Sequence, residues 1–139
     1  LVDGRTREAL GVLKEKNAGP VIIIAIGLSA GIAAKKAQTM LIQDIAGLVI
    51  IDPVQPEGSN FNTDLDAMDL RVPLLDIAPE FFPRTDPAVR KHSAGRTRKD
   101  QYQQRIIRGA RPDFRGQETT VVKAVRGWGE RWFRNRKRS

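Results

Sequence analysis

The strongest constraint on the fold is an aliphatic run, Val21 to Ile26, that ends at Gly27. β-Branched residues without intervening polar positions are typical of a strand buried on both faces, and such strands belong to parallel sheets covered by helices. The small residues at 27–31 indicate a sharp turn, and the Ala-rich segment 30–41 predicts a helix. A second aliphatic strand is expected over residues 46–51. Together these segments predict a βαβ crossover between parallel strands.

The rest of the chain continues this alternation. Hydrophobic spacing and turn residues predict helices over 3–17, 64–70, 86–99 and 119–134, and strands over 72–77 and 102–107. The strand at 102–107 is more polar, which favours a place near the sheet edge. The last helix is expected to gather its apolar residues on one side: Val121, Val122, Val125, Trp128, Trp132 and Phe133. We therefore expect an α/β fold, with a mostly parallel sheet and helices on both faces, over residues 1–134, followed by a basic tail at 135–139.

Composition excludes several kinds of site. The 139 residues contain no cysteine and one histidine, so disulfides, thiolate zinc sites and any metal site with two imidazoles from one chain are excluded. We expect no cofactor and no metal. The net charge of +8 is uneven: residues 1–83 hold 7 Lys+Arg and 11 Asp+Glu, or −4, and residues 84–139 hold 17 and 5, or +12. No nucleic-acid recognition motif accompanies the basic part, so nucleic-acid binding is not favoured.

The apolar stretch from Val21 to Ala34 is interrupted by glycine and serine and is shorter than the roughly 20 residues of a membrane span, which favours a soluble chain. The chain opens at Leu1 without a charged and then apolar leader. We therefore expect either a processed protein or the later part of a longer one.

One motif carries chemical information. Residues 27–31, GLSAG, satisfy Gly-x-Ser-x-Gly between an expected strand and an expected helix. In a nucleophile elbow the serine adopts a strained backbone, which requires small residues two positions before and after it. Ser29 is then the candidate nucleophile, and the N–H of Ala30 the candidate oxyanion donor. The alternative is a turn of small residues that lets a helix pack closely on a sheet.

Several further segments carry a family resemblance: GLVII at 47–51, the spacing from Asn62–Leu65 to Val72–Asp76, YQQR at 102–105 and VRGW at 125–128. With the GLSAG turn, they make the chain resemble the C-terminal half of an α/β-hydrolase, in particular an uncharacterised family of exported bacterial proteins of unknown function. The resemblance implies a location in the periplasm or cell envelope. It also implies an N-terminal half that carries earlier strands and the second oxyanion donor. Because such a fragment would expose a sheet edge, we expect an upstream segment, a partner chain or a second copy to cover it.

A serine hydrolase also needs an acid and a base. In the order of the α/β-hydrolases the acid follows the third strand of this chain, where Glu80 and Asp86 are the candidates. Asp76 lies inside that strand and would need a buried partner, so it is expected to be structural. The histidine should follow the last strand, but the loop at 108–113 has none. The single histidine, His92, lies in the preceding helix and serves as a base only if that helix crosses the strand ends.

The leading hypothesis is an α/β-hydrolase-like protein, a serine esterase if Ser29 finds a base. The alternative is a non-catalytic envelope scaffold that docks through its basic C-terminal region to a partner or an anionic membrane. Arginines beside Trp128, Trp132 and Phe133 suit an interfacial helix, in which each basic residue contributes about 1 kcal/mol. They also suit a core-packing helix with a solvated outer face, which is the favoured interpretation of the two.

Overall fold

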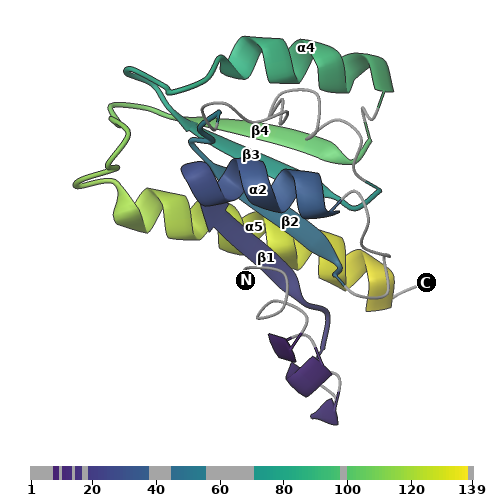
Figure 1. Ribbon diagram of the computed structural model, residues 1–139. Coiled ribbons are helices and arrows are strands. Elements are labelled where there is room, and N and C mark those ends of the chain that lie inside the picture. Colours follow the sequence, from purple (N-terminus) through teal and green to yellow (C-terminus); the bar gives the residue numbers. More distant parts are fainter. Residues whose placement is uncertain are drawn as a thin grey trace.

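The computed structural model describes residues 8–9, 11–13, 15–16, 19–37, 45–55, 71–97 and 100–137. Its elements, shown in Figure 1, are β1 (Ile22–Ile26), α2 (Leu28–Ala37), β2 (Gly47–Ile51), β3 (Leu74–Pro79), α4 (Pro87–Thr97), β4 (Tyr102–Ile107) and α5 (Glu118–Lys137). The strands form one sheet in the order β1-β2-β3-β4, and every neighbouring pair is parallel. The expected α/β fold with a parallel sheet is confirmed.

The sheet has an apolar layer on each face. On one face β1, β2 and β3 pack against α2 and α4, around Ala30, Leu48 and Ala94. On the other face β2, β3 and β4 pack against α5, around Trp128 (Figure 1). A Cβ atom on Gly47 would lie 2.7 Å from Cη2 of Trp128, so α5 reaches β2 only because residue 47 has no side chain.

Several bounds differ from the sequence-based expectations. β3 begins at Leu74 and ends at Pro79, two residues later at each end than expected. α5 continues to Lys137, so residues 135–137 of the expected tail are helical. Val122 is 54% exposed rather than packed with the apolar side of α5. Of the helix expected over 3–17, residues 8–9, 11–13 and 15 are described and helical, whereas the helix expected over 64–70 lies outside the described residues.

β1 differs from the expectation in its burial. Ile24 and Ile26 are 53% and 61% exposed, although the aliphatic run predicted burial on both faces. Among the described residues β1 pairs with β2 alone, so it is an edge strand of the described sheet and one side of it has no neighbouring strand. The other edge strand is β4, as its polar residues predicted. No helix within the described ranges is long and apolar enough to cross a membrane.

Candidate functional site

The carboxyl ends of the strands are the candidate site. Ligands of open parallel sheets bind at this edge. Each strand is followed within three residues by a residue with positive φ: Gly27 (63°), Asp52 (44°), Phe82 (56°) and Gly109 (75°). A left-handed backbone costs a non-glycine residue about 1–3 kcal/mol, and such residues cluster at functional sites. Phe82 is also 74% exposed at this edge. The strained backbone and the exposed phenylalanine both favour ligand binding here.

The turn between β1 and α2 has its positive-φ residue at Gly27 and not at Ser29. Gly27 alone in this turn has a positive φ, and Ser29 is the second residue of α2, with an exposed side chain. The Gly27 N–H donates to the Ile51 carbonyl (2.9 Å), and the Gly27 carbonyl accepts from the Val54 N–H (3.0 Å). The prediction of a strained backbone at Ser29 is therefore wrong, because the helix already begins at Leu28.

The N–H of Ala30, the candidate oxyanion donor, is already engaged in a hydrogen bond within the protein. The Ala30 N–H donates to the Gly27 carbonyl at 3.1 Å, within the first turn of α2. A donor that is engaged inside the protein is not free to stabilise an oxyanion. Small residues do flank the positive-φ position, since Ala25 and Ser29 lie two residues before and after Gly27. The turn therefore has the spacing of a nucleophile elbow with glycine at its apex.

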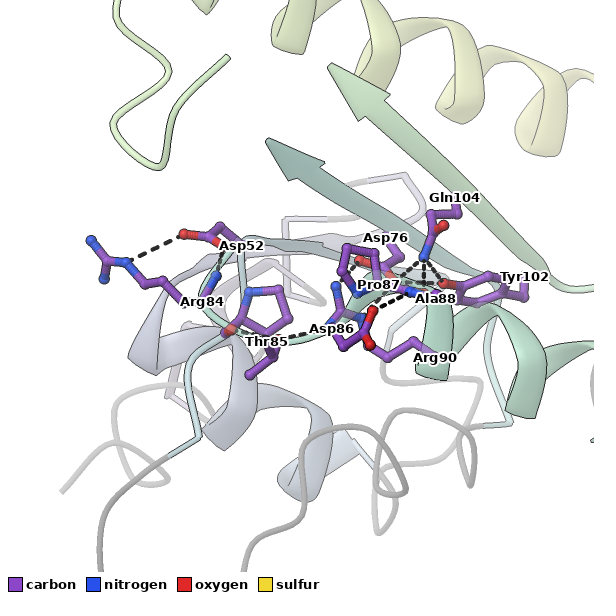
Figure 2. A network of polar contacts seen from close by, with 11 residues as sticks. Asp52, Asp76, Arg84, Thr85, Asp86, Pro87, Ala88, Arg90, Tyr102 and Gln104 are labelled. Carbon is purple, nitrogen blue, oxygen red and sulfur yellow. Dashed lines mark hydrogen bonds and ion pairs between the residues drawn. The ribbon is translucent and has the colours of Figure 1, made fainter. Parts of the chain in front are cut away.

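An ion pair lies beside this apex. Asp52 directly follows β2 and is 3% exposed. Its carboxylate accepts the backbone N–H of Arg84 at 3.0 Å and pairs with the Arg84 Nε at 3.3 Å (Figure 2). A Cβ atom on Gly27 would lie 3.8 Å from Nη1 of Arg84. The guanidinium thus stands next to the place where a nucleophile at position 27 would project.

Burial raises the pKa of Asp52 above its ordinary value of 3.8, although the backbone N–H and the guanidinium of Arg84 both act to lower the pKa. A raised pKa means that the folded protein holds this proton more tightly than the unfolded chain. The contribution of Asp52 to stability is therefore largest at low pH and is lost as pH rises through the raised pKa.

We expect Asp52→Asn to remove this dependence. The free energy of unfolding of the variant minus that of the wild type should increase between pH 4 and pH 7, because only the wild type bears the cost of a buried carboxylate at pH 7. Urea denaturation of both proteins at the two pH values measures the difference. Asp113→Asn is the control, since Asp113 is exposed. A difference that falls with pH would contradict the raised pKa.

The two candidate acids, Glu80 and Asp86, form hydrogen bonds with backbone groups and not with Ser29. Glu80 follows β3, and its Oε1 accepts the N–H of Gly109 at 3.4 Å, in the loop after β4. This is the loop that should carry the histidine in the resemblance, and it carries none. Asp86 caps α4, because its Oδ1 accepts the N–H of Ala88 at 2.9 Å.

His92 is exposed on α4. Within the described part of the chain, no side chain forms a hydrogen bond with the Ser29 hydroxyl. The described residues therefore place neither a base nor an acid within hydrogen-bond reach of Ser29, and its catalytic role stays a prediction. The described residues hold no group of three or more side chains suited to a metal ion.

A buried polar network lies deeper in the sheet. Asp76, in the middle of β3, is fully buried and pairs with the equally buried Arg90 of α4, with Nε–Oδ2 at 2.7 Å and Nη2–Oδ1 at 3.2 Å. Tyr102 and Gln104 of β4 donate to the same carboxylate (Figure 2). Burial and the carboxylate raise the pKa of Tyr102 well above its usual value, so the hydroxyl stays protonated and remains a donor. The partner that the sequence required for Asp76 is therefore Arg90.

The network reaches the carboxyl edge through Thr85. Arg90 donates through Nη1 to the Thr85 hydroxyl, which donates to the Pro53 carbonyl at 2.9 Å. Pro53 follows Asp52 directly, so the buried pair and the edge pair support the same loops. Sequence reasoning missed Arg90 because it appeared as one of several cations on a basic helix. The only available signal was the aspartate inside the preceding strand, which needed a buried partner.

A parallel sheet with helices on both faces, a turn of small residues after β1 and an acid after β3 define the class: the chain has an α/β-hydrolase-like fold. It is similar to a solved esterase domain from a Rhodothermus marinus protein, with a TM-score of 0.63 and 14% sequence identity. The match covers 90% of this chain and 66% of that domain, so the chain spans just under two thirds of its length.

The chain belongs to the family DUF3530, described as proteins of unknown function, whose sequence profile matches residues 1–131. Among curated proteins, none matches the chain.

Proposed function

We propose that this chain is an α/β-hydrolase-like protein that binds ligands of the ester class at the carboxyl edge of its sheet without cleaving them through Ser29. The observation that carries the proposal is the positive φ of Gly27, which stands at the apex of the turn after β1. In a nucleophile elbow the apex is the reacting residue. Glycine supplies no nucleophile there.

The groups around Ser29 agree with this proposal. A serine hydroxyl is a weak nucleophile unless a base within hydrogen-bond reach takes its proton. Ser29 has no such partner among the described side chains, and the N–H of Ala30 is engaged by Gly27. The ligand class is suggested by the similar esterase domain, and the place by the strained loops at the carboxyl edge. No comparison favours the envelope-docking alternative.

The absence of hydrolysis is tested with a fluorophosphonate probe, which reacts covalently with activated serines. We expect intact-mass analysis of the native protein to show no adduct, and p-nitrophenyl butyrate to be cleaved no faster than by the Ser29→Ala variant. A commercial serine esterase serves as the positive control for the probe. An adduct that the Ser29→Ala variant loses would show that Ser29 is a working nucleophile and would overturn the proposal.

Binding is tested separately. Titration with p-nitrophenyl butyrate is expected to shift the amide resonances of Gly27, Asp52 and Phe82 without release of nitrophenol. Arg84→Gln should weaken these shifts, because the guanidinium lies beside the apex of the turn. Arg96→Gln, which changes an exposed arginine in the last turn of α4 and outside the carboxyl edge, is the matched control. Unchanged resonances at the carboxyl edge would refute ligand binding while leaving the conclusion about Ser29 intact.

A further inference from the structure

The guanidinium of Arg84 has N–H donors at the carboxyl edge that no described residue accepts. Its Nε pairs with Asp52 at 3.3 Å, and the backbone N–H of Arg84 donates to the same carboxylate at 3.0 Å. Arg84 forms no other hydrogen bond or ion pair within the described part of the chain. The donors on Nη1 and Nη2 therefore remain for a ligand, and the side chain is 55% exposed, so a ligand can reach them.

The position of Arg84 is fixed by its neighbours. Its partner, Asp52, is 3% exposed and is thus held within the loop after β2. The next residue, Thr85, donates to the Pro53 carbonyl at 2.9 Å and accepts from Nη1 of the buried Arg90 (Figure 2). A side chain that is already held in place loses less conformational entropy when it binds a ligand. The guanidinium of Arg84 is therefore preorganised for binding, unlike that of a freely moving surface arginine.

The unused end of this guanidinium lies beside the turn after β1. Nη1 would lie 3.8 Å from a Cβ atom on Gly27, and a glycine has no side chain that could accept a hydrogen bond from it. In a nucleophile elbow the ester group of the ligand meets the apex of this turn. An ester bound at the apex therefore lies close to the free donors of Arg84.

The acids at this edge do not occupy those donors. The three other described acids in the loops after β3 and β4 each accept a backbone N–H instead: Glu80 that of Gly109, Asp86 that of Ala88 and Asp113 that of Arg115. Asp52 binds the Nε side of the guanidinium. The side of the ion pair that faces a ligand is therefore its positive end, which favours a negatively charged group.

We infer that the ligand bound at this edge carries an oxyanion, either a carboxylate or a phosphate, close to its ester bond, and that the Nη groups of Arg84 bind this oxyanion. The inference rests on the function proposed above, because it names the ligand class of the same site. The planar fork of a guanidinium matches two oxygens of a carboxylate or phosphate, and hydrogen bonds between charged groups are stronger than those to a neutral carbonyl.

The test compares anionic with neutral esters. The native protein is titrated with monomethyl succinate, an anion at pH 7, and with the neutral dimethyl succinate, while its amide resonances are followed by NMR. A second pair, p-nitrophenyl phosphate and p-nitrophenyl butyrate, distinguishes phosphate from carboxylate. In at least one pair we expect the anion to bind about tenfold or more tightly at Gly27 and Asp52, and to shift the Nε–H resonance of Arg84 more than the neutral ester does.

Variants connect this preference to Arg84. Arg84→Gln should abolish the preference for the anion, whereas Arg84→Lys, which keeps the charge but not the planar fork, should retain part of it. Arg96→Gln, at an exposed arginine in the last turn of α4, is the matched control and should leave the preference unchanged. The Nε–H resonance is measured on the wild type, so this readout does not depend on the folding of a variant.

The possible failures of the inference and of the proposed function differ. Equal affinity for both members of both pairs, with shifts at the carboxyl edge, would overturn the oxyanion and leave ester binding intact. A preference that persists in Arg84→Gln would assign the oxyanion to another cation and would overturn the role of Arg84. No shift at this edge with any of the four esters would refute the proposed ligand binding itself.

Discussion

Replacement of Arg90 with methionine is expected to lower the free energy of unfolding by about 3–5 kcal/mol, because it leaves the Asp76 carboxylate buried without a cation. Both side chains are fully buried, and Arg90 donates to both oxygens of the carboxylate. Tyr102 and Gln104 remain as donors but bring no positive charge. Urea denaturation at pH 7, followed by circular dichroism, measures the loss.

Two further variants show whether the charge is the cause. Lys91→Met changes an exposed cation on the same helix and should alter stability by no more than about 0.5 kcal/mol. The double variant Asp76→Leu, Arg90→Met removes both charges and should recover much of the loss, because two apolar side chains can replace a buried pair. A single variant Arg90→Met within 1 kcal/mol of the wild type would contradict the expectation.

Trp128→Ala is expected to cost about 3–5 kcal/mol, because it empties the centre of the layer between α5 and the sheet. Trp128 is 1% exposed and is one of the largest fully buried side chains described. Its Nε1 has no hydrogen-bond partner in the described part of the chain, so its contribution comes from packing. Trp128→Phe should therefore cost less than Trp128→Ala. Thermal and urea denaturation of the two variants provide the comparison.

Gly47 supplies a sharper test of the same contact. Gly47→Ala alone should cost about 1–3 kcal/mol, because its Cβ would lie 2.7 Å from the indole ring. In the Trp128→Ala background the ring is gone, so the added methyl should be tolerated. The two substitutions are thus expected to be non-additive, as for residues in direct contact. Additive effects would mean that Trp128 does not approach β2 in this way.

The elements were predictable where local pattern decides them. β4 was expected and found over residues 102–107, and the continuous aliphatic runs marked β1 and β2 to within a residue or two. The burial of β1 was not predictable, because the same run is buried inside a sheet and exposed at its edge. Pro79 ends β3 although proline lacks a ladder donor, because its nitrogen faces the side of β2, which pairs with β3 only as far as Ile77.

The candidate site shows the same limit. The segment 25–31 has two registers with small residues on either side, one centred on Ser29 and one on Gly27. Composition favours the serine because serine has a hydroxyl. In the structure the positive φ of the turn falls on Gly27, because a residue without Cβ adopts positive φ at no steric cost. Only the junction between β1 and α2 could decide between the two registers.

The sequence by itself determined the alternation of strands and helices, the parallel sheet, the absence of thiols and the lack of a histidine after the last strand. These follow from residue types and from spacings of a few positions along the chain. The tertiary structure alone decided that Arg90 partners Asp76, that Arg84 stands beside Gly27 and that β1 lies at an edge of the described sheet. Each of these depends on residues of different elements that meet in space, where burial and backbone geometry select one arrangement among many.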